Sequence, residues 1–173
     1  MRRMTLALAL AILATPGNAA LPVGATAPDF KTTGALAGKP FKLHLKDQLR
    51  HGPLVLYFYP KAFTQGCTLE AKAFADAMPE FRKAGARVVG MSADDMATLK
   101  RFSTEACRNQ FPVATASPAT IEAYAVVLKQ KPELTDRTSY VIDRKGRIVM
   151  VHSDLDWKDH VTKTLAAVRG LNR

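Results

Sequence analysis

The sequence predicts a single α/β domain in which one sheet is flanked by helices. Three observations support this fold class. Short apolar runs alternate with amphipathic segments of helical period, which is typical of a layered sheet. Two strand-like segments near the carboxyl end flank a turn that contains glycine, and they predict a hairpin. The length of 173 residues suits one domain with a substantial core and is short for two.

The first 19 residues have the pattern of a secretory signal peptide. The basic pair Arg2-Arg3 precedes an apolar run over 4–14, and small residues at Gly17 and Ala19 match a cleavage site. The apolar run is too short to span a bilayer. We expect cleavage after Ala19, with Ala20 as the alternative, and therefore a periplasmic or secreted protein without stable membrane association. An uncleaved amino-terminal anchor is the other interpretation.

Removing 19 of 173 residues leaves 154, which form the expected domain over 20–173. Two of the 25 basic residues and none of the 15 acidic ones lie in the removed segment, so 23 basic residues against 15 acidic ones give a net charge of +8. A charge of this size can steer anionic partners. The basic residues are nevertheless dispersed, without a dense cluster or interleaved aromatic side chains, which argues against nucleic-acid binding.

Two segments in the first half of the domain are predicted to be strands. Residues 21–40 are rich in Gly, Ala, Pro and Thr, which indicates an extended arm with turns. Residues 41–45 alternate apolar and polar side chains, as a half-buried strand does. A Gly-Pro pair at 52–53 turns the chain into the apolar and aromatic run Leu54–Tyr59, a buried strand. Pro60 ends this strand because it has no N–H to donate to the ladder.

An amphipathic helix is expected after a short loop, over about 67–84. Its apolar residues recur at three- and four-residue steps, and Gly85 indicates its end. Thr64 is the candidate N-cap, so Cys67 falls in the first helical turn. The unpaired N–H groups and the positive end of the helix dipole favour a thiolate there. Pro79 removes one hydrogen bond within the helix and predicts a kink or a brief break.

The rest of the chain continues the alternation of strands and helices. A second buried strand is expected over 87–91, and Asp94 or Asp95 can cap a helix that extends to Cys107. The further expected elements are an extended segment at 111–114, a helix over 119–127 opened by Ser117-Pro118, strands over 138–142 and 147–151 joined by 143–146, and a final amphipathic helix with Val161, Leu165, Val168 and Leu171. A thioredoxin-like sheet flanked by helices fits this order.

The cysteine and histidine residues limit the kinds of functional site that the chain could contain. Cys67 and Cys107 could form a disulfide in an oxidising compartment. Neither belongs to a Cys-x-x-Cys pair, which disfavours metal ribbons and thioredoxin-type redox motifs. The four histidines lack metal-ligand spacing, so neither a metal nor a cofactor is expected; they are His44, His51, His152 and His160.

Fast thiolate chemistry needs donors aimed at the charge that develops on a leaving group. Thr64 lies three residues before Cys67, so its hydroxyl could face the same small pocket. A guanidinium from elsewhere would complete such a site, and Arg137 is the candidate, although sequence spacing does not place it there. The structural alternatives are a buried thiol at Cys67, a simple helix cap at Thr64 and a surface cation at Arg137.

Several segments resemble motifs of the peroxiredoxin family, in the same order along the chain. Pro60–Cys67 (PKAFTQGC) resembles the Pro-x-x-x-Thr-x-x-Cys signature, and its flanks Tyr57–Lys61 and Thr68–Ala71 resemble the bacterioferritin-comigratory (Q-type) subgroup. Gly24–Phe30 resembles the amino-terminal motif, and Arg137–Asp143 resembles the segment that bears the active-site arginine. The resemblance covers nearly all of the chain after the signal peptide.

This resemblance implies a thiol-dependent peroxidase that reduces hydrogen peroxide or organic hydroperoxides. Cys67 would be the peroxidatic nucleophile and would become a sulfenic acid. Thr64 and Arg137 would hold the peroxide and stabilise the departing oxygen. Pro60 would shield the thiolate from bulk water, and Glu70 would help to orient the cation. The implied partners are the hydroperoxide and a thioredoxin-like reductant, and the implied oligomeric state is a monomer.

The chain departs from the subgroup at one position. Five residues after Cys67, where a resolving cysteine is often found, the chain has Lys72. Cys107 is then the candidate resolving cysteine, because other Q-type members place theirs on the helix after the second strand. The resemblance thus implies an intramolecular Cys67–Cys107 disulfide, with a purely structural Cys107 as the alternative. Two other functions stay open, a periplasmic thiol–disulfide oxidoreductase and a non-catalytic redox sensor on the same fold.

Overall fold

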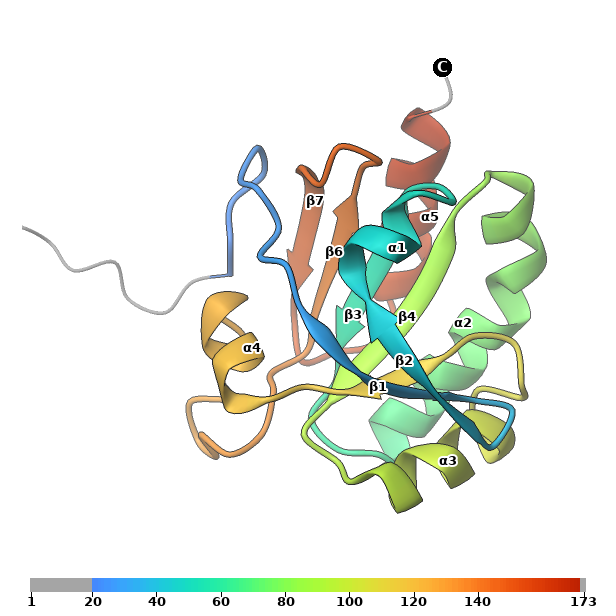
Figure 1. Cartoon of the computed structure of the whole chain (residues 1–173), viewed down its shortest axis with the longest axis vertical. Coiled ribbons are helices and arrows are strands. Elements are labelled where there is room, and N and C mark those ends of the chain that lie inside the picture. Colours follow the sequence, from blue (N-terminus) through green and yellow to red (C-terminus); the bar gives the residue numbers. More distant parts are fainter. Residues whose placement is uncertain (1–19, 172–173) are drawn as a thin grey trace, which may run out of the picture.

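The fold is a seven-stranded mixed sheet with helices on both faces, in a computed structural model that describes residues 20–171 (Figure 1). The expected signal peptide lies outside the described residues. Within 20–171, no helix combines the length and apolar character needed to cross a membrane. The elements in chain order are β1 (Lys31–Leu36), β2 (Lys39–His44), α1 (Leu45–Leu49), β3 (Leu54–Phe58), α2 (Gln65–Lys83), β4 (Arg87–Ser92), α3 (Met96–Glu105), β5 (Val113–Thr115), α4 (Pro118–Ala123), β6 (Thr138–Ile142), β7 (Ile148–Ser153) and α5 (His160–Gly170).

The sheet has the strand order β2-β1-β5-β4-β3-β6-β7. Strands β3, β4 and β5 run parallel to one another, while β6, β7 and the β1–β2 hairpin add antiparallel pairs. The register of β3 pairs Phe58 with Met91 of β4 and with Thr138 of β6. The carboxyl end of β3 therefore lies beside the amino end of β6.

Alternate residues of β3 face two separate apolar layers. Tyr57 stacks on Phe74 of α2, with ring centroids 4.4 Å apart, in the layer that also contains residues of α3 and α5. Phe58 packs against Tyr124, next to α4, in the layer that also contains residues of α1. Figure 1 shows α2 and α5 on the face of the sheet opposite to α4. Burying each large side chain stabilises the fold by about 1.5–3 kcal/mol. All five residues of β3 are buried, so this strand contributes much of the core.

The ends of α2 follow the prediction. The helix begins at Gln65, after Thr64 in the extended N-cap conformation. At the other end Gly85 has a φ of +69°, and the N–H groups of Gly85 and Ala86 donate to carbonyl oxygens of the last helical turn at 2.9 Å each, which is a Schellman motif. The predicted break at Pro79 is absent, because α2 is continuous to Lys83. A proline removes only one N–H donor, and packing of the apolar face holds the rest of the helix.

Residues 31–44 form a hairpin where the sequence predicted an arm followed by one strand. Ala37 and Gly38, with φ of +50° and +75°, make the two-residue turn that joins β1 to β2. Positive φ at both positions matches a type I′ turn. The segment Lys31–Leu36 shows no apolar alternation, so its pattern does not reveal a strand. Pro40 is tolerated because β2 is the edge strand of the sheet.

The helix expected to include Cys107 ends earlier than predicted. Asp95 caps α3 as expected, since its carboxylate accepts the N–H of Thr98 at 2.7 Å. The helix ends at Glu105, and Cys107 lies in the turn that follows, where Arg108 adopts a left-handed φ of +49°. This conformation reverses the chain and stops the helix. The hairpin β6–β7 lies where the sequence predicts it, whereas α4 ends at Ala123 instead of continuing to 127, and Ala125 beyond it adopts a left-handed φ of +53°.

Candidate active site

Cys67 lies in the first turn of α2, beyond the carboxyl end of β3, with 2% of its surface exposed. The short loop that leads from β3 to α2 is anchored at two points. The carbonyl oxygen of Tyr59 accepts the hydroxyl of Thr135 at 2.6 Å, and the N–H of Ala62 donates to the carboxylate of Asp94 at 2.7 Å. These bonds fix the loop and hence the position of the sulfur.

Arg137 brings a positive charge to this sulfur. Its Nη2 donates to Sγ of Cys67 at 3.4 Å, its Nη1 donates to the carboxylate of Glu70, and its Nε donates to the carbonyl oxygen of Leu155 at 2.9 Å. The residue is 5% exposed. The pairing of β3 with β6 explains the meeting, because it places the residue before Thr138 beside the end of β3. Each of the three guanidinium nitrogens donates one hydrogen bond, so the orientation of the group is fixed.

Gly66 makes the close approach of the guanidinium possible. A Cβ atom at this position would lie 3.3 Å from Nη2 of Arg137 and 3.7 Å from Cδ1 of Trp157. The first distance is shorter than ordinary van der Waals contact, so a larger residue would crowd the guanidinium. The glycine between the N-cap and the cysteine therefore has a steric role.

A buried carboxyl group and a buried imidazole lie behind Arg137. One oxygen of Glu70 accepts from Arg137, and the other lies 3.7 Å from Nδ1 of His160. The imidazole also contacts the hydroxyl of Ser139 through Nδ1, at 2.8 Å, and the carbonyl oxygen of Asp154 through Nε2, at 2.9 Å. Burial raises the pKa of Glu70 to about 8 despite the attraction of Arg137, and burial lowers the pKa of His160 to about 4. Both groups therefore favour their neutral forms near pH 7.

Thr64 occupies the N-cap position, but its side chain does not cap the helix. The hydroxyl donates to the carbonyl oxygen of Lys61 at 2.9 Å, and no N–H of the helix donates to it. The backbone carbonyl of Thr64 instead accepts the N–H of Thr68 at 2.9 Å. The hydroxyl is exposed at the start of α2, where its lone pairs are available to accept hydrogen bonds. Pro60, half-buried, lies in the same loop as the sequence predicts.

Cys107 lies in the same apolar layer as Cys67 but has a different environment. Its side chain is fully buried in the layer that also contains Tyr57 and Tyr59. Burial raises the pKa of the Cys107 thiol far above its ordinary value. Both cysteines are free thiols in this structure. The structure thus brings Cys67, Arg137 and Glu70 together and leaves Cys107 outside this polar cluster.

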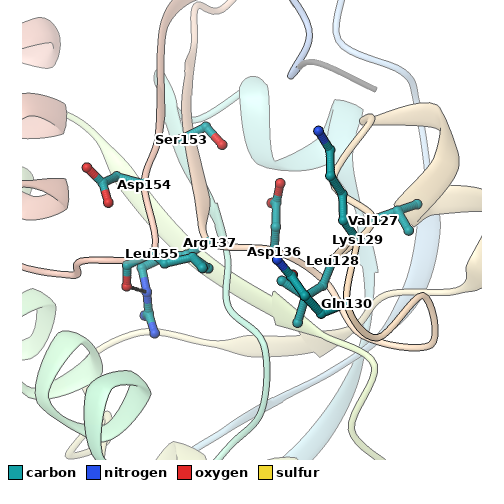
Figure 2. Close-up of a pocket in the computed structure, with 9 residues that line it drawn as sticks. All are labelled: Val127, Leu128, Lys129, Gln130, Asp136, Arg137, Ser153, Asp154 and Leu155. Atoms are coloured by element: carbon teal, nitrogen blue, oxygen red, sulfur yellow. Dashed lines mark hydrogen bonds between the residues drawn. The ribbon is translucent and has the colours of Figure 1, made fainter. Parts of the chain in front are cut away.

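A surface cavity opens beside the cluster (Figure 2). Arg137 and Leu155 lie side by side in one part of its wall, and Lys129 and Asp136 line another part. The remaining lining residues are Val127, Leu128, Gln130, Ser153 and Asp154. Arg137 is therefore shared between the buried cluster and a recess that is open to solvent.

Sequence reasoning missed three residues of this region. His160 appeared only as one of four dispersed histidines, and its position at the start of α5 is a weak signal. Ser139 lies inside a strand, and Asp94, expected as a helix cap, instead accepts hydrogen bonds from Ala62 and from the hydroxyl of Ser92. Over residues 20–171, no three side chains of the metal-binding types gather into a potential metal site.

The known proteins that the chain resembles are peroxiredoxins. The AhpC/TSA family matches residues 23–151. The chloroplastic peroxiredoxin Q of Triticum aestivum is 32% identical over 157 residues, covering 81% of this chain and 72% of that protein. The bcp protein of Helicobacter pylori, named as a peroxiredoxin, is 33% identical over 153 residues, covering 86% of this chain and 98% of that protein.

Solved structures show the same fold. The crystal structure of peroxidoxin BcpB from Mycobacterium tuberculosis matches with a TM-score of 0.74 and 32% identity, covering 86% of this chain and 97% of that one. The reduced 2-Cys peroxiredoxin of Plasmodium vivax matches with a TM-score of 0.77 at 20% identity, covering 87% of this chain and 81% of that one. The second likeness is one of fold alone.

Proposed function

The chain belongs to the AhpC/TSA family and is a thiol peroxidase of the peroxiredoxin Q and bcp type, and from this premise we propose that Cys67 is the residue that attacks the peroxide. The substrate class in this proposal is hydrogen peroxide or organic hydroperoxides. Cys107 acts as the resolving cysteine, and a thioredoxin-like protein supplies the electrons.

In the first step the thiolate of Cys67 attacks the terminal oxygen of a hydroperoxide, ROOH. An S–O bond forms and the O–O bond breaks, which leaves a sulfenic acid on the sulfur and releases RO⁻. The departing RO⁻ takes up a proton and becomes ROH. Arg137 supports this step, because a donor already fixed at the sulfur can also donate to the departing oxygen as negative charge develops there.

One observation carries the proposal, the contact of 3.4 Å between Nη2 of Arg137 and Sγ of Cys67 in a site nearly closed to water. Opposite charges attract more strongly where water is excluded, so this cation favours the thiolate. Thr64 offers a hydroxyl at the start of the same helix. Glu70 and the carbonyl of Leu155 hold the guanidinium in place, and Pro60 limits access of solvent.

Cys107 closes the cycle in the second step. Its sulfur attacks the sulfenic sulfur of Cys67, a disulfide forms and water leaves. In the reduced structure Cys107 is a poor nucleophile because burial raises its pKa, and a disulfide requires Cα atoms within about 7 Å. In the proposed cycle the first turn of α2 and the turn after α3 open after oxidation, which exposes Cys107 and lets the two Cα atoms approach within this distance. A thioredoxin-like dithiol then reduces the disulfide to two thiols and becomes oxidised itself.

The proposal includes export to the periplasm, supported by the signal-peptide pattern of residues 1–19. Fractionation of bacteria that express the full chain, with amino-terminal sequencing of the protein, tests this point. We expect a periplasmic protein that begins at Ala20. A cytoplasmic protein that retains residues 1–19 would contradict the proposal.

A stopped-flow measurement of peroxide consumption by the reduced protein tests the catalytic role of Cys67. The wild type should consume peroxide rapidly, and Cys67→Ser should show no consumption above background. Equal activity of the two proteins would eliminate Cys67 as the nucleophile. Circular dichroism of Cys67→Ser confirms that the exchange of one atom leaves the fold intact.

A further inference from the structure

The loop before Cys67 contains a bulky residue in a strained backbone conformation. Phe63 has a φ of +64°, in the left-handed region that favours glycine. It is the third residue of the turn over 61–64, in which the N–H of Thr64 donates to the carbonyl oxygen of Lys61 at 3.5 Å. A positive φ at this position is typical of a type II turn, where glycine is the usual residue. The backbone of Phe63 is therefore strained for as long as the loop keeps this conformation.

The side chain of Phe63 makes contacts that offset this strain. Its ring packs edge-on against the ring of Phe102 on α3, with centroids 5.2 Å apart and planes at 82°. The guanidinium carbon of Arg101 lies 5.1 Å from the centroid of the Phe63 ring, which is a cation–π geometry. Phe102 is fully buried, whereas Phe63 keeps 39% of its surface exposed. The contact thus lies at the surface, and the loop can leave α3 without disrupting the core.

Phe102 connects this contact to the second cysteine. Its backbone carbonyl oxygen accepts the N–H of Cys107 at 3.1 Å. The same residue thus contacts the loop before Cys67 with its ring and holds the turn of Cys107 with its carbonyl group. A further hydrogen bond joins the loop to the chain just before α3, from the N–H of Ala62 to the carboxylate of Asp94 at 2.7 Å. The segment that contains α3 therefore supports both cysteines in the closed, reduced form.

We propose that Phe63 is a positioning residue that sets how readily the first turn of α2 opens for the disulfide step. In the closed form its ring is docked on Phe102 and its backbone is strained. When the loop leaves α3, the ring loses that contact but the backbone relaxes to an ordinary conformation. Because the two effects oppose each other, the closed form persists during attack on the peroxide and still opens for Cys107. The inference rests on the proposed function, in which Cys67 forms a sulfenic acid that Cys107 converts to a disulfide.

The rate of opening decides between two fates of the oxidised sulfur. In the open form the thiol of Cys107 attacks the sulfenic sulfur, so that an S–S bond forms, the S–O bond breaks and one water leaves. In the closed form, where Cys107 is fully buried, the sulfenic sulfur attacks a second ROOH, gains one oxygen as a sulfinic acid and releases ROH. Phe63 therefore influences the ratio of disulfide to sulfinic acid.

Three variants separate the ring contact from the backbone strain. Phe63→Ala removes the ring but keeps the strain of a left-handed conformation, so the first turn of α2 should open about fivefold more often. Phe63→Gly removes both, and relief of the strain should return opening to within about twofold of the wild type. Leu69→Ala is the matched control, because Leu69 is 40% exposed but lies on the regular helix α2, beyond the strained loop. This control should open like the wild type.

A pulse of hydrogen peroxide, followed by acid quenching, thiol alkylation and mass spectrometry, measures both chemical steps. Sulfenic acid should form at rates within about twofold of one another in all four proteins, which a general loss of structure would not allow. Disulfide formation should be about fivefold faster in Phe63→Ala alone, and that variant should give less sulfinic acid at high peroxide. Equal rates of disulfide formation in Phe63→Ala and the wild type, or in Phe63→Ala and Phe63→Gly, would overturn the proposal.

Amide hydrogen exchange of the reduced proteins tests the opening without peroxide. Amides over 61–68 should exchange about fivefold faster in Phe63→Ala than in the wild type, Phe63→Gly and Leu69→Ala. Amides of β6, inside the sheet, report global stability and should exchange alike in all four proteins. Absence of a disulfide in the oxidised wild type would count against the proposed function, whereas equal exchange over 61–68 in the four proteins would overturn the role of Phe63.

Discussion

The two cysteines are buried in the same apolar layer, yet they differ in charge environment. Cys67, 2% exposed, lies in the first turn of α2 with a guanidinium 3.4 Å from its sulfur. Cys107, fully buried, lies just past the carboxyl end of α3, where the helix dipole disfavours a thiolate, and burial alone raises its pKa. Burial is therefore common to the two cysteines. What distinguishes them is the neighbouring charge and the end of the helix at which each lies.

Replacing Arg137 should remove most of the difference in reactivity that we expect between Cys67 and Cys107. Arg137→Gln should lower the rate of sulfenic acid formation about 10²–10³-fold, because a donor aimed at the developing charge is worth about 3–4 kcal/mol. Arg137→Lys should recover only part of the rate, since one ammonium cannot reach Cys67, Glu70 and Leu155 together. Single-turnover stopped-flow kinetics measure both variants. A loss below threefold in Arg137→Gln would show that the helix start alone activates Cys67.

The second prediction concerns the dependence of stability on pH that the buried carboxyl group of Glu70 causes. The folded-state pKa of Glu70 is raised from 4.5 to about 8, so the folded protein binds this proton more tightly than the unfolded chain does. Stability is therefore lost as the pH rises from about 4.5 to about 8. Between pH 6.5 and 8 the free energy of unfolding should fall by about 2 kcal/mol.

Urea denaturation at the two pH values, with reduced protein, measures this change. Glu70→Gln cannot titrate and should flatten the dependence. His160 acts in the opposite direction at lower pH, because its folded-state pKa of about 4 lies below 6.5 and stability falls as the pH drops through that range. An equal slope between pH 6.5 and 8 in the wild type and in Glu70→Gln would show that Glu70 is already ionised.

The sequence predicts the layered sheet, the starts of α2, α3 and α4, and Cys67 in the first turn of α2. The meeting of Arg137 with Cys67 depends on the antiparallel register of β3 and β6, which local patterns do not encode. Only the resemblance to a family suggested it. His160 enters the site by tertiary packing of α5 against α2, and nothing near it in the sequence points to a carboxyl group. The hairpin of β1 and β2 escaped prediction because its turn residue Ala37 adopts a left-handed conformation that favours glycine.

The third prediction separates the roles of the two sulfurs. Cys107→Ser keeps the cation and helix start at Cys67, so a pulse of peroxide should still produce a sulfenic acid, detected as a dimedone adduct by mass spectrometry. The variant cannot form the internal disulfide, and turnover with a thioredoxin-like donor should fall at least about tenfold. Wild-type turnover by Cys107→Ser would assign Cys107 a purely structural role.

The smallest expected effect concerns the contact that holds the Cys107 turn to the helix of Cys67. Arg108 follows Cys107 with a left-handed φ of +49°, and its Nη1 donates to the carboxylate of Asp76 on α2 at 2.8 Å. The pair is exposed, so it is worth about 0.5–1 kcal/mol and weakens in salt. Asp76→Asn should therefore open the turn more often and speed disulfide formation about two- to fivefold after a pulse of peroxide. The bond from Arg82 to Gln110 remains, which limits the gain.

Fluorescence of Trp157, the one tryptophan, next to the start of α2, can follow this step. Glu80→Gln is the matched control, because it removes another exposed ion pair of α2, the one with Arg169, that does not touch the Cys107 turn. High salt should accelerate the wild type toward the rate of Asp76→Asn and should leave that variant nearly unchanged. Equal rates for Asp76→Asn, Glu80→Gln and the wild type at low salt would mean that opening of α2, rather than release of the Cys107 turn, limits formation of the disulfide.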